Sequence, residues 1–431
     1  MSSTASIPVL SESDNTDRLR FNLEQVLFVC ALIPGIYQFL HPTGYGFGNG
    51  FEMAAIARNL ASQGTFGNPF APAITGPTAV NPPLYPLFLA ALIKLSGPHG
   101  LVLVAVTSNI VANALVAALM PRLSMVFYGD LMPGAFAGAL WIFAMPLMPQ
   151  WDTSFTVAGL VSFCLFSAQS MARQRRGNWS AVAVGLFVGM LSLLNPATVL
   201  IFAPWVAYLF LLRRAPLPYA LRYAATFALV VALCNVPWII RNYRIWHVPV
   251  LRTNFGLTIY SSNNDCAQSS LYQNGRKGCY QNTHPIASRS ETQLLQTLGE
   301  VQYDRRRTAD TLNWIRSHPQ RFRQLTLTRF VEFWFPDPEP SPSTNYAIWV
   351  ITLLSIPGIV LMAKRRHSAT LFALSVWVLY PLMFYIVVSC DRYRHPILWT
   401  SMLPAGYCLA GLLPRTAERP AIPPRLAEEG S

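Results

Sequence analysis

The feature that most constrains this chain is a series of apolar runs, each long enough or nearly long enough to cross a lipid bilayer. A spanning helix needs about 20 apolar residues. Only 12% of the 431 residues are charged, against about 25% in an ordinary soluble domain. The runs predict an all-α polytopic membrane protein with about ten transmembrane helices, at residues 21–40, 101–120, 131–149, 155–172, 180–194, 197–212, 219–240, 345–363, 369–389 and 396–413.

Lys and Arg residues between the runs predict the orientation, because short loops rich in these residues stay on the cytoplasmic side. The clusters fall on one side only if the apolar run Pro82–Ser96 does not cross. We therefore expect this run to lie in the outer leaflet, or to enter the bilayer and return. By the same test, 180–212 forms two short spans with an outside turn at Asn195, rather than one kinked helix. The clusters are 17–20, Arg122, 173–176, 213–214, 364–366 and the tail from Arg415.

This topology divides the chain into a transmembrane part and two outside segments. Both termini are expected in the cytoplasm of a bacterium, with the helices in its inner membrane. The net charge of +13 is explained by the loop clusters, so no nucleic-acid partner is expected. The expected parts are a disordered cytoplasmic tail (1–20), an N-terminal transmembrane module (21–240) with a first outer loop (41–100), a mainly helical periplasmic domain (241–344), C-terminal transmembrane helices (345–413) and a cytoplasmic tail (414–431).

The two outside segments have distinct patterns. In the first, "FEMAAIARNLASQG" predicts a short amphipathic helix lying flat on the membrane. In the second, 289–318 predicts a helix or a helix pair, followed by an amphipathic helix at 320–335. Cys266 and Cys279 lie in this second segment. In an oxidising compartment they form either a disulfide bond or, on the plainer interpretation, two unpaired thiols.

Two outside acids are candidate catalytic groups, because a carboxylate near lipid is costly unless it has a partner. Glu52 begins the predicted amphipathic helix, and Asp152 stands at the turn between two spans. One such acid could take a proton from a hydroxyl while the other orients it. Each also has a structural explanation: Asp152 stands where it caps the next helix, and Glu52 occupies a favourable first-turn position.

Cations on the outside break the positive-inside trend. Arg392, Arg394 and His395 stand at the outer end of one span, and Arg241 stands at the end of another. Arginine suits bidentate phosphate binding, so a lipid phosphate is a natural ligand. The alternative is that these side chains extend to lipid headgroups without binding a specific ligand.

These residues together resemble the bacterial glycosyltransferase family 39 group. That group belongs with dolichyl-phosphate-mannose protein mannosyltransferases and the aminoarabinose transferase of lipid A in the GT-C superfamily. The resemblance spans about residues 45 to 410, and it depends on the order of motifs more than on any one of them. The motifs are the first-loop acid before "ARNL", then "GPTAVNPPLYPLFLAAL", "QWDTSFT", "NVPWIIRNYRIWHVPVLRTNFGL", "HPQRFRQLTLTRFVEFW" and "RYRHP".

The resemblance implies a GT-C-type helical bundle with its chemistry at the periplasmic face and a catalytic N-terminal module. The donor is a polyprenyl-phosphate-linked sugar, transferred to an acceptor hydroxyl in one inverting step. Glu52 is then the base, and Asp152 supports the site or the acceptor. Relatives often have an aspartate where this chain has Asn49, and some have a basic residue where it has Asn81. The phosphate role then moves to Arg392 or Arg394.

The same interpretation requires no cofactor and no nucleotide-binding loop, and it is compatible with a divalent metal. Tyr85 in "PPLYP" is expected near the headgroup layer, beside a rigid lipid entrance. The acceptor stays open between lipid, glycan and protein hydroxyls. Two other classes also stay open: a transporter or flippase for a lipid-linked or anionic substrate, and a membrane scaffold whose outer domain binds a partner.

Overall fold

The computed structural model describes residues 14–41, 52–145, 148, 151–172, 179–213, 216–339 and 341–413. Within these residues the secondary structure is helical, and the only extended pairings are the isolated bridges Gly67–Pro77 and Ser270–Ser389. The predicted all-α class is therefore confirmed.

A bundle of long apolar helices forms most of the molecule. Its first part runs through α1 (Asp14–Leu40), α3 (Leu84–Tyr128), α4 (Met132–Ala144), α5 (Thr153–Ala172), α6 (Trp179–Leu194), the short turn η1 (Pro196–Thr198), α7 (Val199–Arg213) and α8 (Leu217–Trp246). Its last part comprises α15 (Pro342–Lys364), α16 (Ala369–Leu379), α17 (Leu382–Tyr385), the turn η2 (Asp391–Tyr393) and α18 (His395–Leu412).

The remaining helices belong to the two segments expected outside the membrane. They are α2 (Glu52–Gln63) in the first segment, and α9 (Phe255–Ser262), α10 (Leu271–Arg276), α11 (Cys279–Thr283), α12 (Arg289–Leu298), α13 (Glu300–Ser317) and α14 (Pro319–Trp334) in the second. Gly299, with a φ of 73°, separates α12 from α13. The segment 289–318 is therefore a helix pair, and 320–335 falls in a further helix, as the sequence predicts.

The bundle helices fit a multi-pass membrane protein. Five of them in the described chain are long and apolar enough to cross a bilayer by themselves, and shorter apolar helices accompany them. All ten predicted spans coincide with helices. Large apolar side chains such as Leu229 and Leu233 of α8 are exposed by more than half, as expected for a surface that faces lipid.

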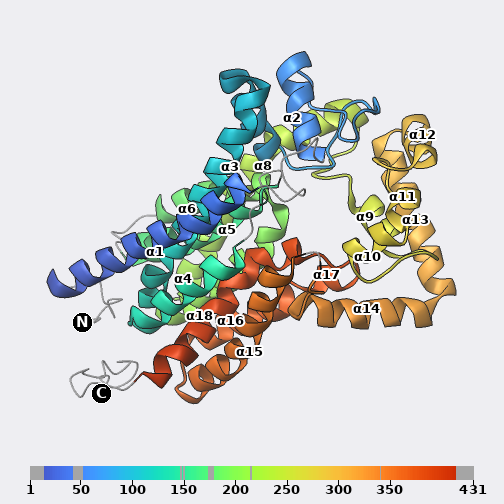
Figure 1. The fold of residues 1–431 in the computed structure, drawn as a ribbon. Helices are drawn as coiled ribbons and strands as arrows, with labels where there is room; N and C mark the ends of the chain where they lie inside the picture. Colours follow the sequence, from blue (N-terminus) through green and yellow to red (C-terminus); the bar gives the residue numbers. More distant parts are fainter. Residues whose placement is uncertain are drawn as a thin grey trace.

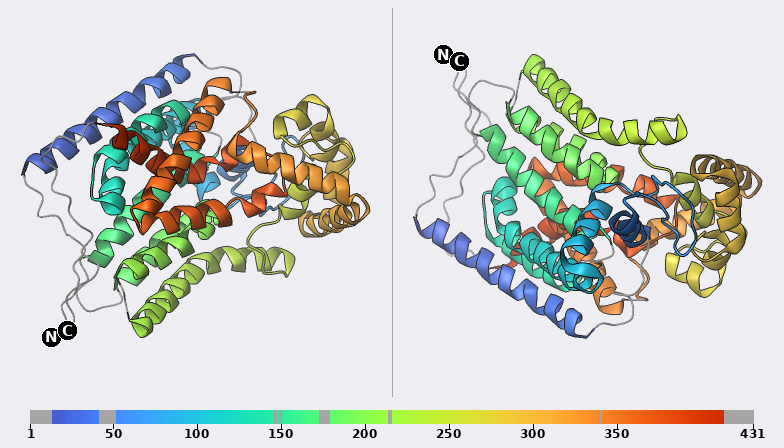
Figure 2. Two further views of the ribbon diagram at one scale, coloured as in Figure 1. Left: turned by 90° about the horizontal axis from the view of Figure 1, so that it is seen from below. Right: turned by 90° about the horizontal axis from the view of Figure 1, so that it is seen from above.

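The bundle has two different ends. The start of α1 and the end of α18 lie at one end, whereas α9 to α14 lie at the other, together with α2 (Figure 1). The view from below agrees, with α9 to α14 beyond one end of the bundle (Figure 2). We call this second end, defined by α2 and α9 to α14, the domain end.

The apolar run at 82–96 forms the first part of α3. This part, Leu84–Gly97, is shorter than a spanning helix. Gly97, with φ of 70° and ψ of 175°, kinks the chain before the long second part. The first part packs beside α2 at the domain end (Figure 1). It is therefore the predicted non-spanning apolar helix.

The run at 180–212 forms two helices that meet at Asn195. The Asn195 Nδ2 donates a hydrogen bond of 3.0 Å to Asp152 Oδ2, which stands just before α5. The start of α5 and the end of α6 therefore lie at the same end of the bundle. Helix α7 then leads away from this turn towards the start of α8. The predicted hairpin is confirmed.

Three expectations need correction. Helix α1 begins at Asp14, within the tail expected to be disordered, and Arg20 of its second turn pairs with Glu24 at 3.7 Å. Residues 1–13 lie outside the described chain. Helix α4 ends at Ala144, where Met145 is extended. The apolar face of α2 does not lie on lipid: Met53 and Ile56 are buried in the protein, where α2 packs on α3.

The contact between α15 and α18 depends on glycine, because it leaves no room for a side chain. A Cβ atom at Gly358 would lie 1.9 Å from the backbone oxygen of Pro404 in α18. A Cβ at Gly406 would likewise lie 2.0 Å from the backbone oxygen of Pro133 in α4. Such contacts hold the helix backbones close together.

We expect Gly358→Ala to lower the stability of the bundle by about 1–3 kcal/mol, the usual cost of overpacking. Gly411→Ala, in the partner helix α18 but with open space around its position, is the control and should have little effect. Thermal unfolding of the purified protein in detergent measures both. Equal unfolding temperatures for the two variants would contradict the packing described for α15 and α18.

Candidate active site at the domain end

Four charged side chains from four distant segments converge at the domain end. Glu52 starts α2, Asp152 precedes α5, Arg252 lies in the link between α8 and α9, and Arg392 lies in η2. The carboxylates of Asp152 and Glu52 both act electrostatically on Arg252 and on Arg392. The structure therefore brings together the two predicted acids and one predicted arginine, and adds Arg252.

Asp152 is held by neutral partners. Its Oδ2 accepts hydrogen bonds from Thr156 Oγ1 at 2.8 Å and from Asn195 Nδ2 at 3.0 Å. Thr156 lies one turn along α5, and Asn195 caps η1. The carboxylate is 6% exposed, so its position is fixed by the ends of two helices.

Arg392 lies over an aromatic ring. Its guanidinium carbon is 3.5 Å from the centre of the Trp151 ring, an arrangement that favours a cation. Burial alone would lower the pKa of Arg392, but Tyr393, Cys390 and the two carboxylates together raise it. This side chain therefore stays charged.

Arg252 was not singled out from the sequence. Its Nε donates a hydrogen bond of 2.7 Å to the backbone oxygen of Val80, which ties the α8–α9 link to the loop before α3. Surrounding protein lowers the pKa of Arg252, while Asp152 and Glu52 act in the opposite direction. The side chain still reaches solvent. The sequence signal that could have identified Arg252 is its isolated position in "VLRTNFG", between a span and a polar segment.

Glu52 meets His284, another residue that the sequence analysis missed. The His284 Nε2 lies 3.5 Å from Glu52 Oε1. The second oxygen, Oε2, is buried and has no hydrogen-bond partner. Burial lowers the pKa of His284, although Glu52 and Glu291 act to raise it. No ion pair of the described chain joins Glu52 or Asp152 directly to Arg252 or Arg392.

The other predicted cations are occupied by the protein. Arg394 donates hydrogen bonds to the Phe333 oxygen, Thr352 and Ser401, and lies 4.1 Å from the Trp334 ring centre. His395 Nε2 lies 3.3 Å from the Ala144 oxygen. Arg241 donates to the backbone oxygens of Thr78 and Phe66 at 2.7 and 2.8 Å. The structure does not bring these three side chains into the cluster. Arg394 and His395 follow Arg392 in a helical turn, where successive residues point in different directions, and Arg241 is bound to the loop before α3.

Tyr85 and Asn81 lie inside the protein near the cluster. Tyr85 is 1% exposed and packs against Phe88 and Phe155, so its ring does not lie on the lipid-facing surface. The Asp152 carboxylate acts electrostatically on the Tyr85 hydroxyl. Asn81 is 2% exposed, and its Nδ2 has no hydrogen-bond partner. Asn49 lies outside the described residues.

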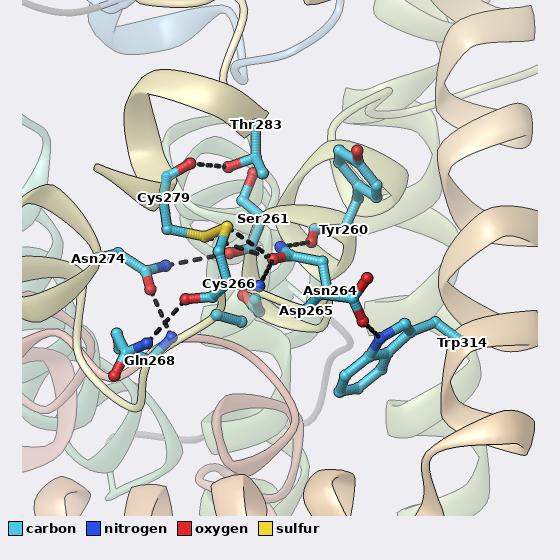
Figure 3. Close-up of a disulfide and its surroundings, with 12 residues drawn as sticks. Tyr260, Ser261, Asn264, Asp265, Cys266, Gln268, Asn274, Cys279, Thr283 and Trp314 are labelled. Carbon is cyan, nitrogen blue, oxygen red and sulfur yellow. Dashed lines mark hydrogen bonds between the residues drawn. A yellow bond between two sulfur atoms is a disulfide. The ribbon is translucent and has the colours of Figure 1, made fainter. Parts of the chain in front are cut away.

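Cys266 and Cys279 form a disulfide bond (Figure 3). Polar side chains fix the segment around it: Asn264 Oδ1 accepts from Cys266 N at 3.0 Å, and Asn274 Nδ2 donates to the Ser261 oxygen at 3.1 Å. Trp314 of α13 donates to Asp265 Oδ1 at 2.7 Å. The disulfide thus lies in a rigid link between α9 and α11, just before His284.

Glu300 fastens the loop that holds Arg252. Its carboxylate accepts hydrogen bonds from Thr253 Oγ1 and, at 2.6 Å, from the backbone N–H of Ala79. It is 5% exposed. Burial raises the pKa of Glu300 to about 7, although the hydrogen bonds and Arg241 act to lower it.

The described residues contain no group of three or more His, Cys, Asp and Glu side chains that could hold a metal ion. Two of the four charges in the cluster are arginines, which repel a cation. These residues therefore do not fit a metal site, and the chemistry below is derived from side chains.

The fold is similar to that of the archaeal oligosaccharyltransferase AglB from Archaeoglobus fulgidus, solved in complex with an inhibitory peptide and a dolichol-phosphate. The TM-score is 0.51 at 13% sequence identity, over 93% of this chain and 51% of AglB. The chain thus spans about half the length of this neighbour. No family model and no curated protein sequence matches it. The likeness shows a GT-C-type fold, whereas membership of glycosyltransferase family 39 stays a prediction.

The raised pKa of Glu300 gives a testable pH dependence. A carboxyl whose pKa rises on folding, here from 4.5 to about 7, stabilises the fold below the unfolded pKa and loses this contribution as pH rises through the folded value. Glu300→Gln keeps an acceptor oxygen but does not titrate. Between pH 5 and about 8, wild-type stability should therefore fall relative to the variant, by on the order of 3 kcal/mol.

Thermal unfolding across this pH range, in one detergent and at constant salt, makes the comparison. Glu339→Gln, at an exposed carboxylate of the same segment, is the control and should follow the wild type. A constant difference between wild type and Glu300→Gln at every pH would rule out a titrating Glu300.

Proposed function

We propose that this protein is a membrane glycosyltransferase that transfers a sugar from a polyprenyl-phosphate-linked donor to an acceptor hydroxyl. The observation that carries the proposal is the convergence of Glu52, Asp152, Arg252 and Arg392 at one end of the bundle. The GT-C-type fold is consistent with it, since the neighbour AglB is an oligosaccharyltransferase in complex with a dolichol-phosphate.

The proposed topology follows from the orientation of the charges. The domain end faces the periplasm of a bacterium, the helices cross its inner membrane, and both termini are cytoplasmic. The module at 21–240 carries the catalytic acids, 241–344 is a periplasmic domain, and 345–413 supplies Arg392. The common position of the α1 start and the α18 end supports this arrangement (Figure 1).

The two arginines are the proposed phosphate site. Neither is tied to an acid in a direct ion pair, so both keep hydrogen-bond donors for an anionic ligand. Trp151 supports the flat face of Arg392, which leaves its N–H groups at the edge of the guanidinium plane. Arginine forms bidentate hydrogen bonds with phosphate and stabilises a phosphate leaving group as its charge develops.

Glu52 is the proposed general base. Its unpartnered Oε2 takes the proton of the acceptor hydroxyl as the hydroxyl oxygen attacks the anomeric carbon. The bond between that carbon and the phosphate oxygen breaks in the same step, and its electron pair leaves with the polyprenyl phosphate. One displacement inverts the anomeric carbon. Asp152, fixed by Thr156 and Asn195, orients the acceptor or the sugar.

The second candidate is a transporter or flippase of a lipid-linked substrate. Transporters bind their substrates near the middle of the membrane, between repeated units. Here the candidate groups gather at one end of the bundle, beside a helical domain, which favours chemistry at the surface. A transporter would move labelled lipid across the bilayer without forming a new glycosidic bond.

We expect Glu52→Gln to abolish sugar transfer, because an amide cannot take the proton. Membranes that contain the protein are incubated with a radiolabelled polyprenyl-phosphate sugar, and label in new glycosidic linkage is counted. Glu339→Gln changes an exposed acid of the linker before α15 and should transfer as well as the wild type. Undiminished transfer by Glu52→Gln would remove Glu52 from the mechanism.

We expect Arg252→Gln and Arg392→Gln each to lower kcat/KM for the donor by about 10- to 100-fold, since a hydrogen bond to a charged group contributes about 1.5–3 kcal/mol. The same assay at varied donor concentration measures this. Arg316→Gln, at an exposed position of α13, should leave kcat/KM unchanged. Donor kinetics unaffected by both cluster substitutions would contradict the phosphate site.

A further inference from the structure

We infer that His284 is a positioning residue that holds one oxygen of Glu52 and leaves the other for the acceptor, so that the segment 241–344 completes the active site. This inference rests on the proposed function. It assigns a role to the contact between Glu52 at the start of α2 and His284 at the end of α11. The two residues are more than 200 positions apart, and neither helix needs this contact in order to form.

The hydrogen bonds of the imidazole indicate which nitrogen carries the proton. The backbone N–H of Ile286 donates to His284 Nδ1 at 3.3 Å, so Nδ1 is the acceptor and Nε2 carries the hydrogen. Nε2 is the atom that lies 3.5 Å from Glu52 Oε1. In this tautomer the neutral ring has its N–H on the nitrogen that lies nearest to the carboxylate, an arrangement that orients catalytic groups in other enzymes.

The ring itself is rigidly held. Tyr280, one turn earlier, stacks on it with ring centres 4.6 Å apart and planes at 15°. Phe70 of the first outer segment meets it edge-on at 5.6 Å. The Thr283 hydroxyl donates to the Cys279 oxygen at 2.9 Å, and Cys279 is fixed by the disulfide (Figure 3). The imidazole can thus act as a fixed point for a flexible glutamate.

The two oxygens of Glu52 have different surroundings. Oε1 faces His284, whereas Oε2 is buried without a partner. A buried oxygen without a hydrogen bond is costly unless a ligand supplies one, and an acceptor hydroxyl would do so. The other ionisable groups near the pair are Tyr280 and Glu291 around His284, and Arg252 and Arg392 around Glu52.

The test compares two amides of similar chemistry at position 284. The side-chain nitrogen of Gln reaches the place of Nε2, whereas that of Asn reaches only the place of Nδ1. His284→Gln should therefore keep sugar transfer within a few-fold of the wild type, and His284→Asn should lower kcat on the order of tenfold with little change in the KM for the donor. His284→Phe, which keeps the stacked ring but has no donor, should resemble His284→Asn.

His318 is the matched control. It too stacks on an aromatic ring one turn earlier, Trp314, at 5.0 Å, but it is exposed and lies at the end of α13. His318→Asn should leave both kcat and the KM for the donor unchanged. Unfolding temperatures in detergent identify any variant that fails to fold. If His284→Phe fails to fold, the comparison of His284→Gln with His284→Asn still tests the inference.

Equal rates for His284→Gln and His284→Asn would overturn the inference. No transfer by the wild type would instead overturn the proposed function itself, and the two failures are distinguishable. Wild-type transfer that Glu52→Gln abolishes, together with selective rescue by His284→Gln, is the expected result.

Discussion

The cost of keeping charged groups at the end of an apolar bundle governs the architecture of the domain end. A buried charge needs partners, or it neutralises. Here the partners are mostly neutral: Thr156 and Asn195 for Asp152, Trp151 for Arg392, and a backbone oxygen for Arg252. The charges are thus held in place without cancelling one another in direct pairs. A site built in this way keeps its binding capacity for a charged ligand.

The same constraint explains how an irregular loop can be rigid. Residues 66–80 have little regular structure, so their backbone groups need partners from elsewhere. Arg241 binds the oxygens of Phe66 and Thr78, Arg252 binds that of Val80, and Glu300 accepts from the N–H of Ala79. Two arginines and one glutamate therefore fasten the loop to α8, to the α8–α9 link and to α13. Arg241, expected from its sequence position to bind substrate, acts as such a fastener.

The sequence predicted what depends on local composition and on the bilayer. The positions of the spans, the non-spanning run before Gly97 and the turn at Asn195 follow from apolar length and loop charge, and the structure has all three. Placing acids and cations on one side also predicted that Glu52, Asp152 and Arg392 could meet. Side-chain direction was not predictable, because Arg392 and Arg394 differ by two positions yet contact different segments, Trp151 before α5 and Trp334 of α14. His284 was not predictable either, since only the tertiary fold brings α11 to α2.

The charged groups at the two ends of the bundle differ in how they are paired, and this difference bears on function. Away from the domain end, Arg122 binds both oxygens of Glu24 at 2.6 Å, so the acid and the base satisfy each other. Such a bidentate pair has little capacity left for a ligand. At the domain end Glu52 keeps one unpartnered oxygen, and both arginines keep donors. In the proposed reaction, an anionic leaving group and a hydroxyl acceptor supply what these groups lack, and the described residues offer these groups at the domain end.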